Sequence, residues 1–240
     1  MARFYFTELI LVLAILSIIG VLAGSMAIIG AAGALVVGLS YVFTLSVNWL
    51  LKPVEKHIND GFVKDAKRML SQMPNMTIVG ITGSYGKTST KHYLNRILSE
   101  KYSVLMTPGS YNTPMGVVRT VREMMQPYND LFIVEMGAKN VGDIKEICDI
   151  VKPQLGIVTA VGAQHLESFK SIENVQRTKF ELVDALPSDG FAVVNNDFPY
   201  VANREVDNVE CVRYSVGEEN NGTYRAVNIR YSSSGTSFTI

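Results

Sequence analysis

Cysteine and histidine are scarce in this sequence of 240 residues, which has two cysteines and three histidines. Cys148 and Cys211 lie far apart, and neither has a second Cys or His at the spacing of a metal-ligand motif. A disulfide framework and a structural zinc site are therefore unsupported. We expect both thiols to be buried and the compartment to be reducing.

An excess of either charge is also absent, since 22 lysines and arginines balance 22 aspartates and glutamates. Proteins that bind nucleic acid usually carry clustered positive charge, so we expect no nucleic acid partner. Hydrophobic residues make up 48% of the chain and charged residues 18%. That composition excludes a disordered chain and allows a full hydrophobic core.

Charged side chains are missing altogether from Leu9 to Leu51, a run of 43 positions. One transmembrane helix needs about 20 residues, so the run is long enough for two. The small residues Gly24-Ser25 and Gly30-Ala31-Ala32-Gly33 offer a place to turn between them. Residues 1–51 are therefore predicted to form a transmembrane helical hairpin.

Positive charges flank this run and predict its orientation. They are Arg3, Lys52, Lys56 and Lys67. By the positive-inside rule, both ends of the hairpin and everything after it lie in the cytoplasm. A signal peptide or a buried pair of soluble helices are the alternatives, but signal-peptide apolar regions are only about 7 to 15 residues long.

Residues 52–75 mix charged and apolar residues at near-helical spacing. This pattern predicts a juxtamembrane linker helix, amphipathic or simply solvated.

From Thr77 onward, short β-branched runs alternate with helical patterns, which is typical of parallel βαβ units. Strands are expected at 77–82, 104–107, 131–136, 155–161, 191–195 and 209–214. Helices are expected at 87–101, 115–125, 142–151 and 171–186. The fold class is thus α/β, with a mostly parallel sheet of P-loop type flanked by helices, and the domain is expected to cover residues 76–240.

The first of these strands runs directly into a glycine-containing loop and then a helix. We expect the loop to bind nucleotide phosphates through Gly83, Ser84, Tyr85, Gly86, Lys87, Thr88 and Ser89. Glycines let backbone N–H groups face a phosphate, and the helix N-terminus adds positive potential. Lys87 can reach the β and γ phosphates, and the Thr88 hydroxyl can bind magnesium. The alternative is a plain turn, which this order of strand, loop and helix disfavours.

The segment from Ile81 to Thr90 resembles the shortened P-loop of the Mur ligases, which join amino acids or peptides to the peptidoglycan precursor. Three later segments agree with the resemblance: Asn112-Thr113-Pro114-Met115-Gly116, Val134-Glu135-Met136-Gly137, and His165-Leu166-Glu167 followed by Lys179. Among the branches of the family, this combination is most similar to the ligases that add D-alanyl-D-alanine to a UDP-muramoyl-tripeptide.

The resemblance implies an ATP-dependent ligase that phosphorylates a muramyl-peptide carboxylate to an acyl phosphate, which D-alanyl-D-alanine then attacks. Catalysis of such a phosphoryl transfer rests on positioning and charge stabilisation. The catalytic residues implied are Lys87, His165 and Lys179. Magnesium, in two sites, would be held by Thr88, Glu135, His165 and a carbamylated Lys179.

Asn112 and Thr113 are implied to contact the substrate, although a plain Pro/Gly-rich connection is the alternative for that loop. Glu135 could otherwise be a strand-end carboxylate, His165 an ordinary loop histidine, and Lys179 a solvated helix lysine. Glu167 could merely stabilise its loop. The implied location is the bacterial cytoplasmic membrane, with the catalytic domain facing the cytoplasm.

Two departures from the family pattern leave alternatives open. The membrane run occupies the place of the family's uridine-binding domain, so the carboxylate substrate could be UDP-linked or lipid-linked. The chain also stops inside an apparent hairpin of strands 225–231 and 236–240, so we expect a C-terminally incomplete domain that is inactive alone. A membrane-bound polyglutamate-type ligase and a membrane-anchored P-loop NTPase or kinase are the competing functions.

Overall fold

The computed structural model describes residues 2–22, 26–216, 222–233 and 235–240. The chain divides into two compact units, Met1–Asp60 and Gly61–Ile240. The boundary falls inside a long helix, so each unit is described by itself.

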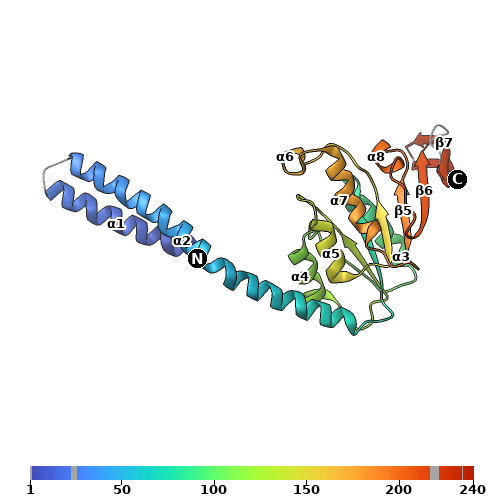
Figure 1. Cartoon of the computed structure of the whole chain (residues 1–240), viewed down its shortest axis with the longest axis horizontal. Helices are drawn as coiled ribbons and strands as arrows, with labels where there is room; N and C mark the ends of the chain where they lie inside the picture. Colours follow the sequence, from blue (N-terminus) through green and yellow to red (C-terminus); the bar gives the residue numbers. More distant parts are fainter. Residues whose placement is uncertain (1, 23–25, 217–221, 234) are drawn as a thin grey trace. The chain divides into compact units, whose positions relative to one another are not determined.

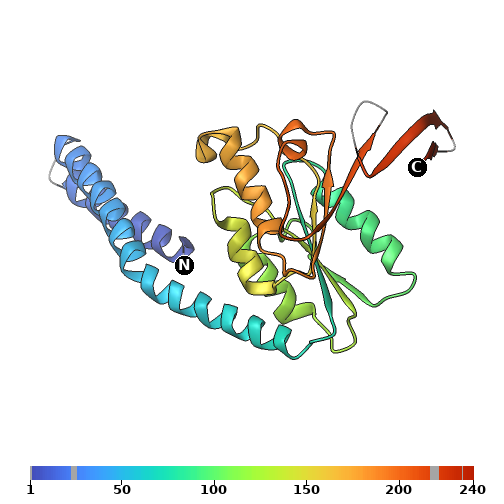
Figure 2. The ribbon, with the colours of Figure 1, turned by 45° about the vertical axis from the view of Figure 1, so that its right-hand side comes forward.

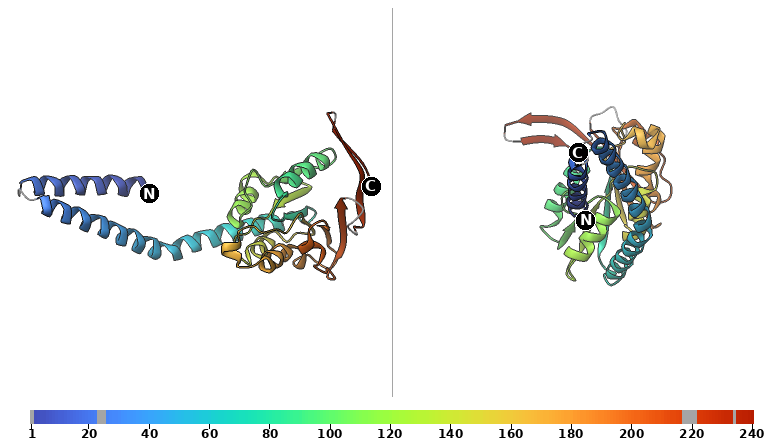
Figure 3. Two further views of the ribbon diagram at one scale, coloured as in Figure 1. Left: turned by 90° about the horizontal axis from the view of Figure 1, so that it is seen from above. Right: turned by 90° about the vertical axis from the view of Figure 1, so that its left-hand side faces the viewer.

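The first unit consists of helix α1 (Ala2–Leu22) and the first part of α2 (Met26–Ser71), which run antiparallel (Figures 1 and 3). The predicted turn at Gly24-Ser25 lies outside the described residues, whereas residues 30–33 are helical and form no turn. Helix α2 also continues through Pro53. The linker that was expected from residue 52 is therefore a continuation of α2.

Apolar side chains along both helices of this unit are exposed, including Leu39 and Trp49. In the described part of the chain, Gly33–Ser71 is the one helical segment long and apolar enough to cross a membrane by length and composition, and Ile10–Ile19 is a shorter apolar segment. The most apolar window of the long segment is not buried within the structure, unlike the core helix of a soluble protein. The transmembrane hairpin itself stays a prediction.

The second unit is built on an eight-stranded sheet in the order β2-β3-β1-β4-β5-β6-β7-β8. The strands are β1 (Thr77–Thr82), β2 (Val104–Met106), β3 (Leu131–Glu135), β4 (Leu155–Val158), β5 (Phe191–Asn195), β6 (Glu210–Val216), β7 (Tyr224–Ser232) and β8 (Gly235–Thr239). Neighbours from β2 to β7 pair in parallel, and only the β7–β8 pair is antiparallel. The predicted mostly parallel α/β fold is confirmed.

Helices cover the two faces of this sheet unequally (Figure 2). The helices are α3 (Lys87–Leu98), α4 (Pro114–Met124), α5 (Asp143–Val151), α6 (Leu166–Phe169), α7 (Ile172–Asp184) and α8 (Pro199–Ala202). Helices α4, α5 and α7 lie on one face, and α3 lies on the other. Side chains alternate between the faces, so Val134 packs towards α4 and α5 while its neighbour Ile133 packs towards α3.

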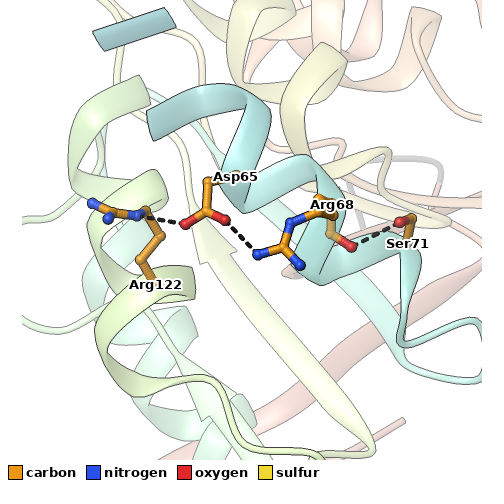
Figure 4. Close-up of polar contacts among 4 residues, drawn as sticks. All are labelled: Asp65, Arg68, Ser71 and Arg122. Carbon is orange, nitrogen blue, oxygen red and sulfur yellow. Dashed lines mark hydrogen bonds and ion pairs between the residues drawn. The ribbon is translucent and has the colours of Figure 1, made fainter. Parts of the chain in front are cut away.

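The end of α2 belongs to the core of the second unit. Ala66 is fully buried within the same cluster as Val117 and Val121 of α4, and Val63 and Met69 pack against that cluster. Polar contacts reinforce the packing at its edge (Figure 4). An apolar stripe therefore fixes the last turns of α2 to the sheet, although the sequence pattern there suggested only a linker.

Strand β1 lies inside the sheet, between β3 and β4. From β1 the chain crosses to β2 at the edge, returns to β3 beside β1, and then adds β4 on the other side of β1, so the strand order reverses there. In open α/β sheets, ligands bind beyond the carboxyl ends of the strands at such a reversal. The P-loop follows the carboxyl end of β1 there, and Glu135 is the last residue of β3.

Candidate active site at the carboxyl ends of β1, β3 and β4

The P-loop connects β1 to α3 through two glycines with positive φ. Gly83 has φ +150° and Gly86, the N-cap of α3, has φ +81°. A Cβ on Gly83 would lie 2.1 Å from Thr159 Oγ1, so no larger residue fits at this close approach. Helix α3 therefore starts with its free N–H groups at the carboxyl edge of the sheet, as a phosphate site requires.

Ser84 and Tyr85 tie the P-loop to the segment that follows β4. The backbone N–H of Ser84 donates to Ala160 O at 2.8 Å, and its hydroxyl contacts both Gly162 O and Gly162 N at 3.1 Å. Thr159 Oγ1 donates to Tyr85 O at 2.5 Å. The buried side chain of Ser84 thus fixes the loop from behind, whereas Tyr85 is exposed.

Lys87 opens α3 and bends back over the loop. Its ammonium donates to Gly83 O at 2.6 Å and to Ser84 O at 3.5 Å. Burial lowers the pKa of Lys87, while the negative charge of Glu135 acts in the opposite direction. The side chain thus places a positive charge beside the backbone N–H groups that would receive phosphates. Ser89, two residues later, lies on the first turn of α3.

Thr88 and Glu135 bring oxygen donors together in front of the P-loop. The Thr88 hydroxyl lies 3.1 Å from Glu135 Oε1 and 3.2 Å from Oε2. Magnesium prefers oxygen ligands and is commonly held in nucleotide sites by one or two protein oxygens, with phosphates and waters completing the shell. This pair fits such a magnesium ion, and its role as a magnesium site stays a prediction.

Lys91 was not identified from the sequence as part of the site. It lies one turn beyond Lys87 on α3, is fully buried, and pairs with Glu135 Oε2 at 2.8 Å. Its ammonium also donates to Gly109 O at 2.7 Å. The spacing of four residues from Lys87 was the available signal, but a lysine on a helix is usually solvated.

A cavity of about 360 Å³ opens beside the P-loop. The predicted site residues that line it are Lys87, Asn112, Thr113, His165 and Lys179. Lys139 and Asp143 also line it, so positive side chains outnumber negative ones there. The cavity is thus suited to an anionic group next to the phosphate site.

Asn112 and Thr113 have structural contacts besides lining the cavity. Asn112 O accepts a hydrogen bond from Gly137 N at 2.7 Å, and Thr113 Oγ1 caps α4 by accepting from Gly116 N at 3.3 Å. A Cβ on Gly137 would lie 2.8 Å from Asn112 Cγ, which explains the glycine after Glu135-Met136. The loop is therefore held tightly against the end of β3.

Lys179 is a second buried lysine of the site, since only 2% of it is exposed. Burial, followed by the positive charge of Lys87, lowers its pKa to about 8, while Asp143 and Glu181 act in the opposite direction. Its Nζ lies 5.9 Å from the centroid of the Phe169 ring. A lysine with this pKa is partly neutral near physiological pH and can act as a nucleophile.

His165 is exposed, with φ +54°, and it precedes the short helix α6, on which Glu167 is exposed as well. Among the described residues, no group of three or more His, Cys, Asp or Glu side chains could hold a metal. His165 and a protonated Lys179 do not make a metal site, because an ammonium has no lone pair to offer a metal ion. A second metal would need Lys179 in an anionic form.

Glu181 is a further residue that the sequence did not point to. From α7, its carboxylate accepts from Gly142 N at 2.7 Å and from Lys145 N at 2.9 Å, and so caps the N-terminus of α5. Asp143 in turn accepts from the backbone N–H groups of Lys139 and Asn140. These contacts fix the rim of the cavity beside Lys179, two residues before Glu181.

The fold and this site define a P-loop α/β domain of the nucleotide-binding class, with a cationic cavity beside the phosphate loop. A family profile described as the Mur ligase middle domain matches residues 81–240. The chain belongs to the Mur ligase family, and the resemblance noted in its motifs is confirmed.

Several similar proteins carry the name UDP-N-acetylmuramoyl-tripeptide–D-alanyl-D-alanine ligase. The protein from Mycobacterium tuberculosis is 38% identical over 163 residues, which cover 64% of this chain and 32% of the relative. The protein from Escherichia coli is 30% identical over 198 residues, covering 79% and 43%. The chain therefore spans about a third to two fifths of the length of these relatives.

Solved structures agree with the sequence relatives. A MurF ligase from Thermotoga maritima in complex with ADP superposes with a TM-score of 0.68 at 30% identity, covering 75% of this chain and 41% of that one. ADP is thus a ligand of a structurally similar protein.

Proposed function

We propose that this chain is the nucleotide-binding part of an ATP-dependent ligase that adds D-alanyl-D-alanine to a muramyl-peptide carboxylate. The observation that carries the proposal is that Lys87 of the P-loop and the buried Lys179 line one cavity. The names of the relatives supply the substrates.

The reaction needs two steps. A carboxylate oxygen of the muramyl peptide attacks the γ-phosphorus of ATP, which forms an acyl phosphate and releases ADP. The amine of D-alanyl-D-alanine then attacks the acyl carbon, which expels phosphate and loses a proton to form the amide. Both partners of the first step are anions, so their repulsion must be reduced before they can meet.

Residues of this chain fit that requirement. Lys87 and the N–H groups at the start of α3 would hold the phosphates, and Thr88 and Glu135 would hold magnesium, which supplies charge neutralisation when it is bound. Asn112 and Thr113 also line the cavity, where the muramyl carboxylate would enter.

Lys179 is proposed to be carbamylated. Its neutral amine would attack carbon dioxide, form an N–C bond and lose a proton, which converts a cation into an anionic oxygen donor. The lowered pKa of Lys179, about 8, raises the fraction of neutral amine that this step needs. Together with His165, the carbamate would provide the second magnesium site, since hard cations prefer oxygen ligands.

We also propose that the first unit anchors the protein at the bacterial cytoplasmic membrane, with both termini in the cytoplasm. Support comes from the uncharged run of residues 9–51 and its positive flanks. The test is fractionation of cells that express the chain. Recovery in the soluble fraction, or cleavage of the C-terminus by protease added outside the cells, would contradict the anchor.

Product analysis tests the ligase function, with the gene expressed to its natural stop codon. ADP and an amide product should appear in equal amounts, and only when ATP, a muramyl tripeptide and D-alanyl-D-alanine are all present. Phosphate released from ATP alone at the same rate would favour an NTPase. Repeated addition of glutamate would favour a polyglutamate ligase.

A further inference from the structure

Lys91 is so deeply buried that its ammonium needs polar partners within the protein. It is 0% exposed, and its ammonium lies 2.8 Å from Glu135 Oε2 and 2.7 Å from Gly109 O. A buried ammonium without such contacts would be strongly unfavourable. These contacts join three elements: the P-loop helix α3, the end of β3, and the loop after β2.

One partner of Lys91 is the carboxylate proposed to hold magnesium. Glu135 is 2% exposed and receives the Thr88 hydroxyl as well as the Lys91 ammonium, while its own backbone N–H donates to Thr107 Oγ1 at 3.0 Å. The side chain is therefore fixed on one side by α3, and its backbone is fixed by the residue that follows β2.

The other partner is the loop that lines the cavity. Gly109 has φ +47°, and three residues later Asn112 O accepts from Gly137 N, two positions beyond Glu135. Lys91 fastens the first half of the loop and Gly137 fastens the second. Both contacts connect the loop to the end of β3, the first through Glu135 and the second through Gly137.

We propose that Lys91 is a positioning residue that fixes the Glu135 carboxylate and the loop 108–113 relative to each other. A single ammonium then holds the carboxylate proposed to bind magnesium in a fixed position relative to the loop whose residues Asn112 and Thr113 line the cavity. The identity of the substrate that uses this arrangement rests on the proposed function, but the arrangement itself does not.

The experiment compares Lys91→Met with Lys91→Arg and with Lys101→Met, which changes an exposed lysine just beyond α3. Magnesium is titrated at a fixed ADP concentration, and amide exchange is followed by mass spectrometry. Lys91→Met should weaken magnesium-dependent ADP binding at least ~10-fold and speed exchange of peptides spanning 109–112, with exchange in α7 unchanged. Lys91→Arg should restore most of the binding, and Lys101→Met should match the wild type.

Unchanged loop exchange in a folded Lys91→Met protein would overturn the proposal. Uniformly faster exchange across the sheet would do the same, because it would mean that Lys91 only stabilises the fold. If Lys91→Met does not fold, the double variant Lys91→Met with Glu135→Met replaces the buried pair with apolar side chains, an exchange that proteins often tolerate. Its loop should still exchange faster, and a protected loop would overturn the proposal.

These measurements need only magnesium and ADP, so they do not depend on the ligase reaction. In the ligation assay, Lys91→Met should also raise the KM for the muramyl peptide at least ~10-fold, with partial recovery in Lys91→Arg. Failure of the wild type to ligate would refute the proposed function and leave the exchange test of Lys91 intact.

Discussion

Arg122 of α4 donates a hydrogen bond from Nε to Asp65 Oδ2 of α2 at 3.0 Å (Figure 4). The same guanidinium lies 4.2 Å from the centroid of the Phe62 ring, and Asp65 also pairs with Arg68. Arg68 first, and then Arg122, lowers the pKa of Asp65. Helix α2 is thus attached to α4, whose first residue, Pro114, lines the cavity.

Burial of Ala66 beside this ion pair predicts that Ala66→Asp destabilises the second unit by about 3 kcal/mol or more, because an unpaired carboxylate would enter the core. Lys67→Asp, at the exposed neighbouring position, should change stability by about 0.5 kcal/mol at most. Urea unfolding of residues 52–240 and of both variants would measure the difference. Equal stability of the two variants would mean that the end of α2 is not part of the core.

The close approach of Gly83 to Thr159 predicts that Gly83→Ala destabilises the protein by about 3 kcal/mol, because steric overlap adds to backbone strain. Gly142→Ala is the matched control, since Gly142 also has a positive φ, +98°, but a Cβ there would meet nothing within 4 Å. Strain alone should cost about 1 to 2 kcal/mol there. Thermal unfolding of both variants tests this, and a milder effect at Gly83 than at Gly142 would contradict the P-loop geometry.

Removal of the Lys87 ammonium should weaken binding of magnesium-ADP and lower the ligation rate at least ~100-fold, because a strong electrostatic stabiliser is lost. Calorimetric titration of Lys87→Ala would measure the affinity. Thr88→Ser keeps the hydroxyl beside Glu135 and should bind nearly as the wild type does, whereas Thr88→Ala should lose the magnesium dependence. Equal affinities for the wild type and Lys87→Ala would refute the assignment of the phosphate site.

The lowered pKa of Lys179, about 8 against an ordinary 10.5, predicts a pH-dependent stability. Between these values the unfolded chain keeps a proton that the folded chain has released, so the free energy of unfolding rises with pH across this interval. Below pH 8 the folded state carries a penalty of about 3 kcal/mol from this group.

Lys179→Met should therefore stabilise the protein at pH 7, and the gain should shrink towards pH 10. Urea unfolding in bicarbonate-free buffer at both pH values would measure it, with Lys170→Met, an exposed position, as the control. The same gain at pH 7 and pH 10 would contradict the lowered pKa. Added bicarbonate should reduce the penalty in the wild type if the carbamate forms.

Local sequence determined the elements and the phosphate loop. The β-branched run of β1, followed at once by Gly83, Gly86 and Lys87, specifies a strand, a turn and a helix start within residues 77–88, so neighbouring residues alone carry that information. The predicted bounds of β1 and β5 are those observed, and the other predicted strands and helices after Thr77 differ from the structure mainly at their ends.

Burial of single polar residues was decided only by the tertiary structure. Lys91 and Lys179 lie on helices whose patterns would suit a solvated lysine, yet both are buried because their helices turn these faces towards the carboxyl ends of the strands. Likewise, Ala66 enters the core because α4 and α5 supply a surface for it. The partners in these contacts come from residues far away in the chain, as with Lys91 and Glu135, and no local pattern encodes which distant residues will meet.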